Sequence, residues 1–527
     1  MVALLFLYGV WLRWISGLVA VTTEDSFLFL SPALFGKFSE AGPRTFPYPL
    51  FLKICIEYLG GFPAAILGQK VAGLATAGLI FGAWSRLKCV LPYRLAGIVL
   101  HDLLGLFMLS HLLLEHATMR YYEQAIMLES TSSLCLAAFI FAACHFFVLV
   151  RLRSPERTIA ISGAILIGAS LLTYAWNPRF GPATVFAFPI AFAGLNAARM
   201  RAARIFLVYF VPVALSGLLF FLPQFLISRS NGWNRAFIPK HLFYVHARLV
   251  LPELVHDRDD PGFKRYRHEI LEQLSSLIEQ ELARAERDGP GGNFTLGFSP
   301  NLLLWGKADG ILHNFFADDP DGYREFCLYY FMQAVRNQPG AYAQKVAVEW
   351  NFLLQPGFPI MDSSLSPYAL KDMINGGNCL PGAREMVPRA TDAVRPAFQA
   401  FVVQLENHAS YDDLVLSSPD FLRFEGSWVN DYFSYSLLSA LAACGLCLWR
   451  KFRDPGHVNL CLVFAGSALL LLGLIAPITI VMTVCGGRHI QGLRVAFVFC
   501  AASSTLLTVM LAASLVGARR LLFLPAD

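Results

Sequence analysis

Residues 21–50 read VTTEDSFLFLSPALFGKFSEAGPRTFPYPL, and they carry an adjacent acidic pair, Glu24 and Asp25, directly after an apolar first segment. Arg44 and a Pro-Tyr-Pro motif come just before the chain becomes apolar again. Two carboxylates at the mouth of a membrane span are costly unless water, a cation or a bound substrate compensates their charge. This stretch is therefore the first candidate for chemistry, and the apolar segments around it decide the fold.

The composition of the chain is that of a polytopic membrane protein. Of its 527 residues, 56% are hydrophobic and 15% are charged, and the mean hydropathy is +0.52. A soluble domain has roughly 25% charged residues. The formal net charge of +5 is small. The sequence also shows no basic stripe with interleaved aromatics, no zinc-type Cys/His spacing and no glycine-rich phosphate loop, so we expect no nucleic-acid partner.

Apolar runs of about 20 residues, the length that crosses a bilayer, predict ten spans. They cover residues 2–20, 62–83, 95–114, 126–150, 159–175, 182–198, 205–227, 433–449, 459–484 and 493–517. The first of them contains a charge, Arg13. Basic residues gather in every second connection and in the C-terminal tail. By the positive-inside rule, these connections and both termini are cytoplasmic.

This pattern predicts an all-α protein in three regions: an N-terminal transmembrane region at 1–227, an extracytoplasmic domain at 228–432 and a C-terminal transmembrane region at 433–527. Within the outer domain, residues 262–287, 319–337 and 340–354 have apolar side chains at helical spacing and predict helices. The rest, rich in Pro, Gly, Asn and Ser, is predicted to be loop. Whether Cys327 and Cys379 in this domain pair with each other stays open.

Polar side chains gather at the predicted outer ends of the spans. Carboxylates lie in the first two outer loops, and arginines lie at the ends of later spans. They are Glu24, Asp25, Glu129, Arg179, Arg488 and Arg494. Arginine binds phosphate with bidentate geometry, and a carboxylate accepts a proton from an attacking group. The inventory favours a reaction on an anionic lipid head group.

Short motifs in these loops resemble those of GT-C-fold glycosyltransferases. E-D-S-F at 24–27, followed by R-T-F-P-Y-P-L-F-L at 44–52, resembles their first outer loop. Y-Y-E-Q-A-I-M-L-E-S at 121–130 resembles their second acidic site, and T-Y-A-W-N-P-R at 173–179 resembles a short later loop. R-N-Q-P-G-A-Y at 336–342 resembles an Asn-Pro-x-x-Tyr element of bacterial members. Bacterial protein O-mannosyltransferases and aminoarabinose transferases are the relatives that these motifs indicate.

The resemblance implies a GT-C-like bundle in the bacterial inner membrane and an inverting glycosyltransferase. The enzyme would move a sugar from a polyprenyl-phosphate donor to an extracytoplasmic lipid, glycan or protein. Asp25 would be the catalytic carboxylate, with Glu24 and Glu129 beside it. Several relatives have Asp-Glu or Asp-Asp where this chain has Glu-Asp, so the choice of base between Glu24 and Asp25 stays open.

The resemblance also assigns the substrate contacts. Arg44, Arg179, Arg488 and Arg494 would bind the donor phosphate, and Tyr48, Tyr122 and His489 would bind substrate. No cofactor is required. A divalent cation at the carboxylates stays an alternative, because carboxylates suit hard cations.

Other functions and purely structural roles are also open. An O-antigen ligase or polymerase would rely on histidines and arginines of the outer domain, namely His241, His246, His256, Arg235 and Arg248. A transporter would have broken helices at matching positions of two halves, a symmetry that the sequence does not show. The acidic pair could instead cap the following helix, Glu129 could be hydrogen-bonded within the bundle, and Arg488 and Arg494 could be interface anchors.

Overall fold

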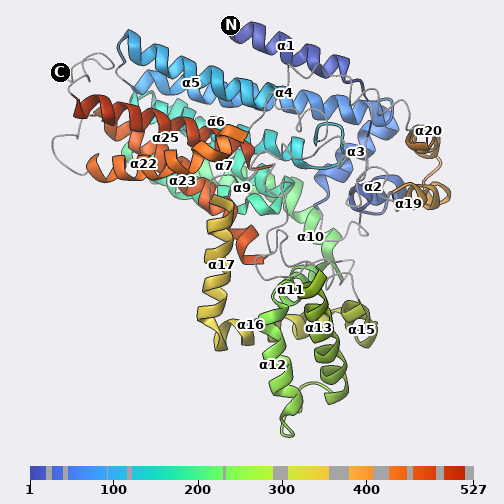
Figure 1. Ribbon diagram of the computed structural model, residues 1–527. Coiled ribbons are helices and arrows are strands. Elements are labelled where there is room, and N and C mark those ends of the chain that lie inside the picture. The colour runs from blue at the N-terminus through green and yellow to red at the C-terminus, as the bar shows by residue number, and fades with distance from the viewer. Residues whose placement is uncertain are drawn as a thin grey trace. The chain divides into compact units, whose positions relative to one another are not determined.

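The computed structural model describes residues 1–18, 20, 26–38, 45–91, 93–114, 122–229, 233–288, 307–354, 379–406, 427–447, 455–481 and 492–516. These residues form helices and no β-strand (Figure 1). The chain divides into two compact units. Unit 1 comprises Met1–Gln224, Pro356–Leu474 and Ile490–Asp527, and unit 2 comprises Phe225–Gln355 and Ile475–His489.

Eight stretches of the described chain are helical, long enough and apolar enough to cross a membrane. They contain α4 (Phe62–Leu87), α5 (Leu95–Leu114), α6 (Glu129–Arg151), α7 (Glu156–Trp176), α8 (Gly181–Ala197), α9 (Ala202–Ser216) with α10 (Leu222–Arg229), α23 (Pro455–Val481) and α25 (Arg494–Leu515). Each coincides with one of the ten predicted spans. Within the described residues, these helices confirm the prediction of an all-α, multi-pass membrane protein.

The other two predicted spans, 2–20 and 433–449, contain shorter apolar helices. The first, α1 (Val2–Ile15), has 14 residues, which makes a helix of about 21 Å against a hydrocarbon core of roughly 30 Å. The second, α22 (Ser427–Cys447), has a described apolar part at Ser434–Leu446. These two spans stay predictions.

Unit 1 is held together by the close packing of its long helices. α6 packs against α4, α7 and α8, and α25 packs against α5, α22, α4 and α6. Small residues let α25 approach its neighbours closely. Ser503 and Ser504, for example, are fully buried and donate their hydroxyls to the carbonyls of Cys500 and Ala501 in their own helix. By contrast, α8 and α9 expose many apolar side chains, as lipid-facing helices do.

A second apolar cluster of unit 1 surrounds the first turn of α4. It joins α2 (Ser26–Phe35) and α3 (Pro47–Tyr58) to α19 (Cys379–Met386) and α20 (Arg395–Glu406). The rings of Phe62 and Phe401 stack with centroids 4.1 Å apart. Residues 379–406 therefore belong to unit 1, whereas the predicted outer domain included them. Their apolar face fits the start of α4.

Unit 2 is built from α11 (Trp233–Val245), α12 (Ala247–Asp259), α13 (His268–Asp288), α15 (Lys307–Phe315), α16 (Pro320–Asn337) and α17 (Pro339–Leu354). The predicted helices at 262–287, 319–337 and 340–354 are confirmed as α13, α16 and α17. The prediction of loop for 233–259 and 307–315 is wrong. Prolines lie inside α11 and α12, and burial of these helices overrides their low propensity. Cys327 is a free thiol, buried in the core of this unit.

Candidate functional site

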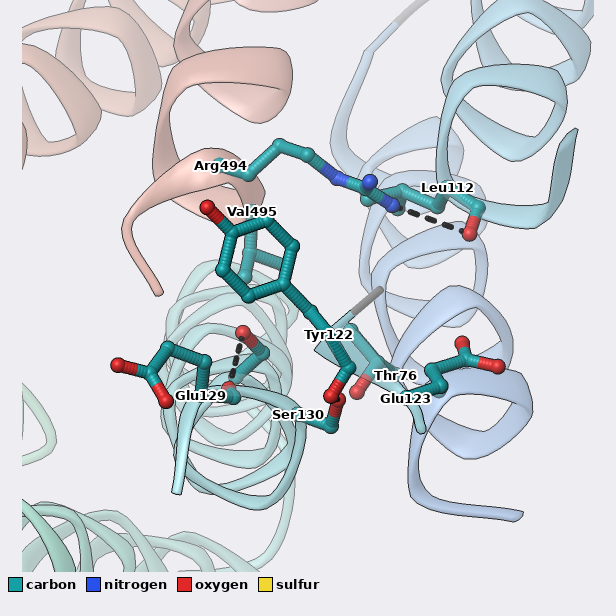
Figure 2. Close-up of a pocket in the computed structure, with 10 residues that line it drawn as sticks. Thr76, Leu112, Tyr122, Glu123, Glu129, Ser130, Arg494 and Val495 are labelled. Atoms are coloured by element: carbon teal, nitrogen blue, oxygen red, sulfur yellow. Dashed lines mark hydrogen bonds between the residues drawn. The ribbon is translucent and has the colours of Figure 1, made fainter. Parts of the chain in front are cut away.

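A small polar cavity in unit 1 lies where several helix ends meet (Figure 2). Its wall comes from the middle of α4, the C-terminal end of α5, the segment 122–130 and the N-terminal end of α25. The lining residues are Gly73, Thr76, Leu112, Tyr122, Glu123, Glu129, Ser130, Ser133, Arg494 and Val495. The volume is about 30 Å³, which is room for about two water molecules. The cavity fits a polar group and is too small for a sugar ring.

Three of the predicted site residues, Tyr122, Glu129 and Arg494, line this polar cavity. Arg494 is 5% exposed, and its Nη2 donates to the carbonyl of Leu112 at 3.1 Å. Glu129 is 9% exposed and is the first residue of α6, where the helix dipole favours negative charge. The hydroxyl of Ser130 donates to the carbonyl of Tyr122 at 2.9 Å, which fixes Tyr122 against α6.

A second carboxylate, Glu123, lies on the other side of Tyr122 from Glu129 (Figure 2). Its side chain is fully buried, and its Oε1 accepts from Arg13 Nη2 at 2.6 Å. Arg13 also donates to the carbonyls of Gly9 and Leu113, each at 3.1 Å. Sequence reasoning did not assign Arg13 or Glu123 to the site. The signal was present, because a charge within an apolar segment requires a partner.

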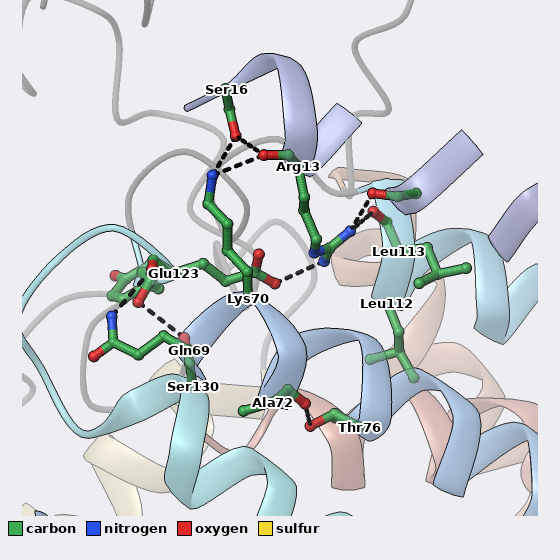
Figure 3. A network of polar contacts seen from close by, with 12 residues as sticks. Arg13, Ser16, Gln69, Lys70, Ala72, Thr76, Leu112, Leu113, Glu123 and Ser130 are labelled. Carbon is green, nitrogen blue, oxygen red and sulfur yellow. Dashed lines mark hydrogen bonds and ion pairs between the residues drawn. The ribbon is translucent and has the colours of Figure 1, made fainter. Parts of the chain in front are cut away.

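Close approach of α4 makes this ion pair possible. A Cβ atom at Gly73 would lie 2.0 Å from Glu123 Oε1, so a larger residue at position 73 would displace the carboxylate. One turn earlier, Lys70 Nζ donates to the carbonyl of Arg13 at 2.9 Å and to Ser16 Oγ at 2.7 Å (Figure 3). It also donates to the carbonyl of Gly17. A cation at the C-terminal end of a helix stabilises its last carbonyls. Lys70 thereby holds the end of α1 against α4, next to the cavity.

Burial and the neighbouring positive charges shift the pKa of Glu123 in opposite directions. Burial raises the pKa of its carboxyl above the usual range, and the positive charges of Arg13, Lys70 and Arg494 reduce that rise. Its Oε2 is buried and makes no hydrogen bond within the described residues. A bound hydroxyl or a water molecule in the polar cavity could donate to this oxygen.

Tyr48 supports the wall of the cavity without lining it. The side chain is fully buried, and its hydroxyl donates to Gln69 Oε1 at 2.6 Å. Gln69 Nε2 donates in turn to the carbonyls of Glu123 and Ala125, at 3.0 Å and 2.8 Å. Burial, and then the negative charge of Glu129, raise the pKa of Tyr48 well above its usual value. The structure therefore gives Tyr48 a positioning contact, and its predicted role in binding substrate stays a prediction.

Of the remaining predicted residues, only Arg179 lies within the part of the chain that the structure describes, and it does not line the polar cavity. Arg179 lies in a short 3₁₀ helix, Pro178–Phe180, and is half-buried away from the lining. Glu24, Asp25, Arg44, Arg488 and His489 lie outside the described residues. Among the residues that are described, no group of His, Cys, Asp and Glu could hold a metal ion.

Two of the five residues predicted for a ligase lie in the core of unit 2. His241 and His246 are buried, and their Nδ1 atoms pair with the carbonyls of Phe237 and Leu242 at 2.9 Å and 2.8 Å. Arg235 lies 3.8 Å from Asp321. These contacts stabilise the helices of unit 2, and the ligase alternative stays a prediction.

The polar cavity thus combines two carboxylates that could accept protons with an arginine fixed by a backbone carbonyl. Such a set can activate a hydroxyl and stabilise a developing negative charge. Comparison with protein-family models, with curated proteins and with solved structures found no match to this chain.

Proposed function

We propose that the protein is an integral membrane glycosyltransferase of GT-C type. It would move a sugar, with inversion, from a polyprenyl-phosphate donor to a lipid, glycan or protein acceptor outside the bacterial inner membrane, with both termini in the cytoplasm. The observation that carries the proposal is the convergence of Tyr122, Glu129 and Arg494 on one cavity. Arg494 lies far from the other two in the sequence.

The place of the polar cavity along the bundle supports this proposal. Under the positive-inside rule, the C-terminal end of α5 and the N-terminal ends of α6 and α25 all belong to the outer side. The cavity lies at these ends. The basic residues Arg86 and Arg151 lie in the last turns of α4 and α6, at the other ends of their helices. A donor whose sugar is displayed outside the membrane would meet the carboxylates there.

The proposed chemistry assigns one role to each kind of charge. Displacing polyprenyl phosphate from the anomeric carbon builds negative charge on the phosphate, and Arg494 would stabilise it. Removing one such preorganised donor commonly costs about 3 kcal/mol of barrier or more. Glu129, or Asp25 as the resemblance implies, would accept the proton of the attacking acceptor group, a contribution of roughly 10²–10⁴-fold. No metal or other cofactor takes part in the proposed reaction.

The test is transfer or release of labelled sugar from polyprenyl-phosphate donors in proteoliposomes. Glu129→Gln should lower turnover by about a hundredfold or more while the protein remains inserted and folded. Glu156→Gln is the matched control, because Glu156 is also the first residue of a spanning helix, α7, and its exposed side chain pairs with Arg204. Equal turnover for the wild type, Glu129→Gln and Asp25→Asn would refute the proposal.

One observation favours a second candidate, a transporter. Arg13, Lys70 and Glu123 are charged groups buried within an apolar bundle, and such groups often mark ion or proton pathways. A transporter would move a labelled solute across the proteoliposome membrane without altering the donor lipid. Donor turnover without solute uptake supports the transferase, and uptake without turnover supports the transporter.

A further inference from the structure

A broad groove in unit 2 runs along the exposed face of α16. Its volume is about 890 Å³, within the range of roughly 300–1,000 Å³ that ligand sites occupy. The lining residues are Arg265, Arg324, Glu325, Leu328, Tyr329, Met332, Gln333, Val335 and Arg336. We call this feature the α16 groove.

The floor of the α16 groove is fixed by the fold. Side chains at Arg324, Leu328, Met332 and Arg336 recur every four residues and share one face of the helix. From the first to the last they span roughly 18 Å at about 1.5 Å per residue. The opposite face of α16, with Phe326 at its centre, is buried in the core of unit 2. The groove is therefore a preformed surface with the length of a short oligomer.

The charge of the α16 groove favours an anionic ligand. Its lining has three arginines and one carboxylate. Arg265 Nη2 lies 2.5 Å from Glu325 Oε1, and Arg324 lies 3.6 Å from Asp321. Arg336 is exposed and makes no ion pair within the described residues. Guanidinium groups bind carboxylate and phosphate with two parallel hydrogen bonds.

The α16 groove also presents an aromatic ring and an amide, from Tyr329 and Gln333, that can contact the rings and hydroxyls of a saccharide. The guanidinium carbon of Arg265 lies 4.2 Å from the centre of the Tyr329 ring, a cation–π contact that fixes both groups. Gln333 Nε2 donates to the Tyr329 hydroxyl at 3.1 Å. These contacts place planar polar groups beside the apolar side chains of Leu328, Met332 and Val335 in the groove.

We propose that the α16 groove binds an acidic saccharide, a short chain of sugar rings that carries carboxylate or phosphate groups. Arg336 and Arg324 bind the anionic groups at the two ends, and Tyr329 and Gln333 contact the rings between them. The proposal concerns binding alone and does not depend on the transfer reaction proposed for unit 1.

Calorimetric titration of the full-length protein in detergent tests this assignment. The probe is a tetrasaccharide of alternating glucuronate and N-acetylglucosamine, compared with a neutral glucose tetrasaccharide of equal length. We expect the acidic probe to bind at least tenfold more tightly. Arg336→Ala and Tyr329→Ala should each weaken its binding tenfold or more. Arg384→Ala, at an exposed arginine of α19, should leave it unchanged.

Each alternative outcome overturns the assignment. Equal binding of the neutral tetrasaccharide removes the role of charge. Equal binding of a tetraglutamate peptide shows that the surface binds any anionic chain, or acidic peptides, and does not recognise a saccharide. Unchanged binding by Arg336→Ala, or weakened binding by Glu129→Gln in unit 1, places the saccharide elsewhere. Failure of the transferase assay has no bearing on this titration.

Discussion

Replacing Gly73 with alanine tests whether the buried pair of Arg13 and Glu123 holds the polar cavity together. A Cβ atom at position 73 would lie 2.0 Å from Oε1 and 2.8 Å from Cδ of Glu123, whereas real Cβ contacts essentially never fall below 3.0 Å. The carboxylate oxygen must therefore move by at least 1.0 Å. Arg13 cannot follow freely, because the carbonyls of Gly9 and Leu113 hold its guanidinium at 3.1 Å.

The magnitude follows from the interactions that this movement breaks. Breaking a buried ion pair costs about 3–5 kcal/mol, and alanine in place of glycine within a helix returns about 1 kcal/mol. We expect Gly73→Ala to lower the free energy of unfolding by about 2–4 kcal/mol. Under the proposed function, turnover should fall about a hundredfold, since a misplacement of about 1 Å in a catalytic site costs that much.

The matched control for this variant is Gly78→Ala on the same helix. There the nearest atom to the new Cβ is Phe6 Cζ at 3.5 Å, an ordinary contact. Thermal unfolding of the detergent-purified variants, followed by tryptophan fluorescence, compares their stabilities, and donor turnover compares their sites. Adding Glu123→Asp to Gly73→Ala should restore part of the stability, because the shorter side chain withdraws from the new methyl group. Equal unfolding temperatures for the two glycine variants would refute the reasoning.

Three further predictions concern other buried contacts. Burial, and then the charge of Lys345, lower the pKa of His246 to about 3, so the folded state binds fewer protons than the unfolded state between pH 3 and its ordinary value near 6.5. The stabilisation is therefore fully present above about pH 6.5, and the free energy of unfolding falls below that pH by up to about 1.4 kcal/mol per pH unit. In pH-dependent unfolding experiments, His246→Gln should flatten this fall, whereas His256→Gln, at an exposed position, should not. Lys345 and Glu349 form an ion pair at 3.0 Å, and their side chains are 1% and 0% exposed. Lys345→Met should therefore lower the free energy of unfolding by about 3–5 kcal/mol in denaturant titrations. The double variant with Glu349→Leu should recover most of this loss. Gly194→Ala puts a methyl group 2.4 Å from an aromatic carbon of α6 and should cost about 1–3 kcal/mol in thermal unfolding.

The spans could be predicted from the sequence because their physical cause is local. A helix must present about 20 apolar residues to the bilayer whatever its neighbours do, and eight of the ten predicted spans satisfy this in the described chain. The amphipathic helices α13, α16 and α17 were predictable for the same reason. α11 and α12 were not predictable, because Pro239 and Pro252 argue against a helix. The burial of Phe243 and Leu254, which outweighs this low propensity, arises only from tertiary packing.

The residues of the candidate site also divide into those that a local sequence pattern reveals and those that only tertiary packing brings together. Glu129 and Arg494 were predicted because each lies at the end of a span, which the sequence reveals. The partnership of Arg13 with Glu123 joins residues 110 positions apart. It depends on how α1, α4 and α5 pack and on the missing side chain at Gly73. No local pattern encodes such a contact, although Arg13 within an apolar segment signals that some partner exists.

The described charges around the polar cavity do not cancel, and the imbalance bears on the ligand. Arg13, Lys70 and Arg494 act on Glu123, and Glu129 lines the same cavity. With both carboxylates ionised, these side chains carry one excess positive charge, and a proton retained by Glu123, whose pKa burial raises, increases the excess. An excess of positive charge inside a membrane protein is stabilised by an opposite charge, so under the proposed function an anionic group would be favoured at the cavity in either state. Under the proposed function, a departing polyprenyl phosphate would supply that anion beside Arg494. The guanidinium of Arg494 is already fixed by a backbone carbonyl and would stabilise the new charge without reorganisation. A transported cation would instead be repelled by the same excess.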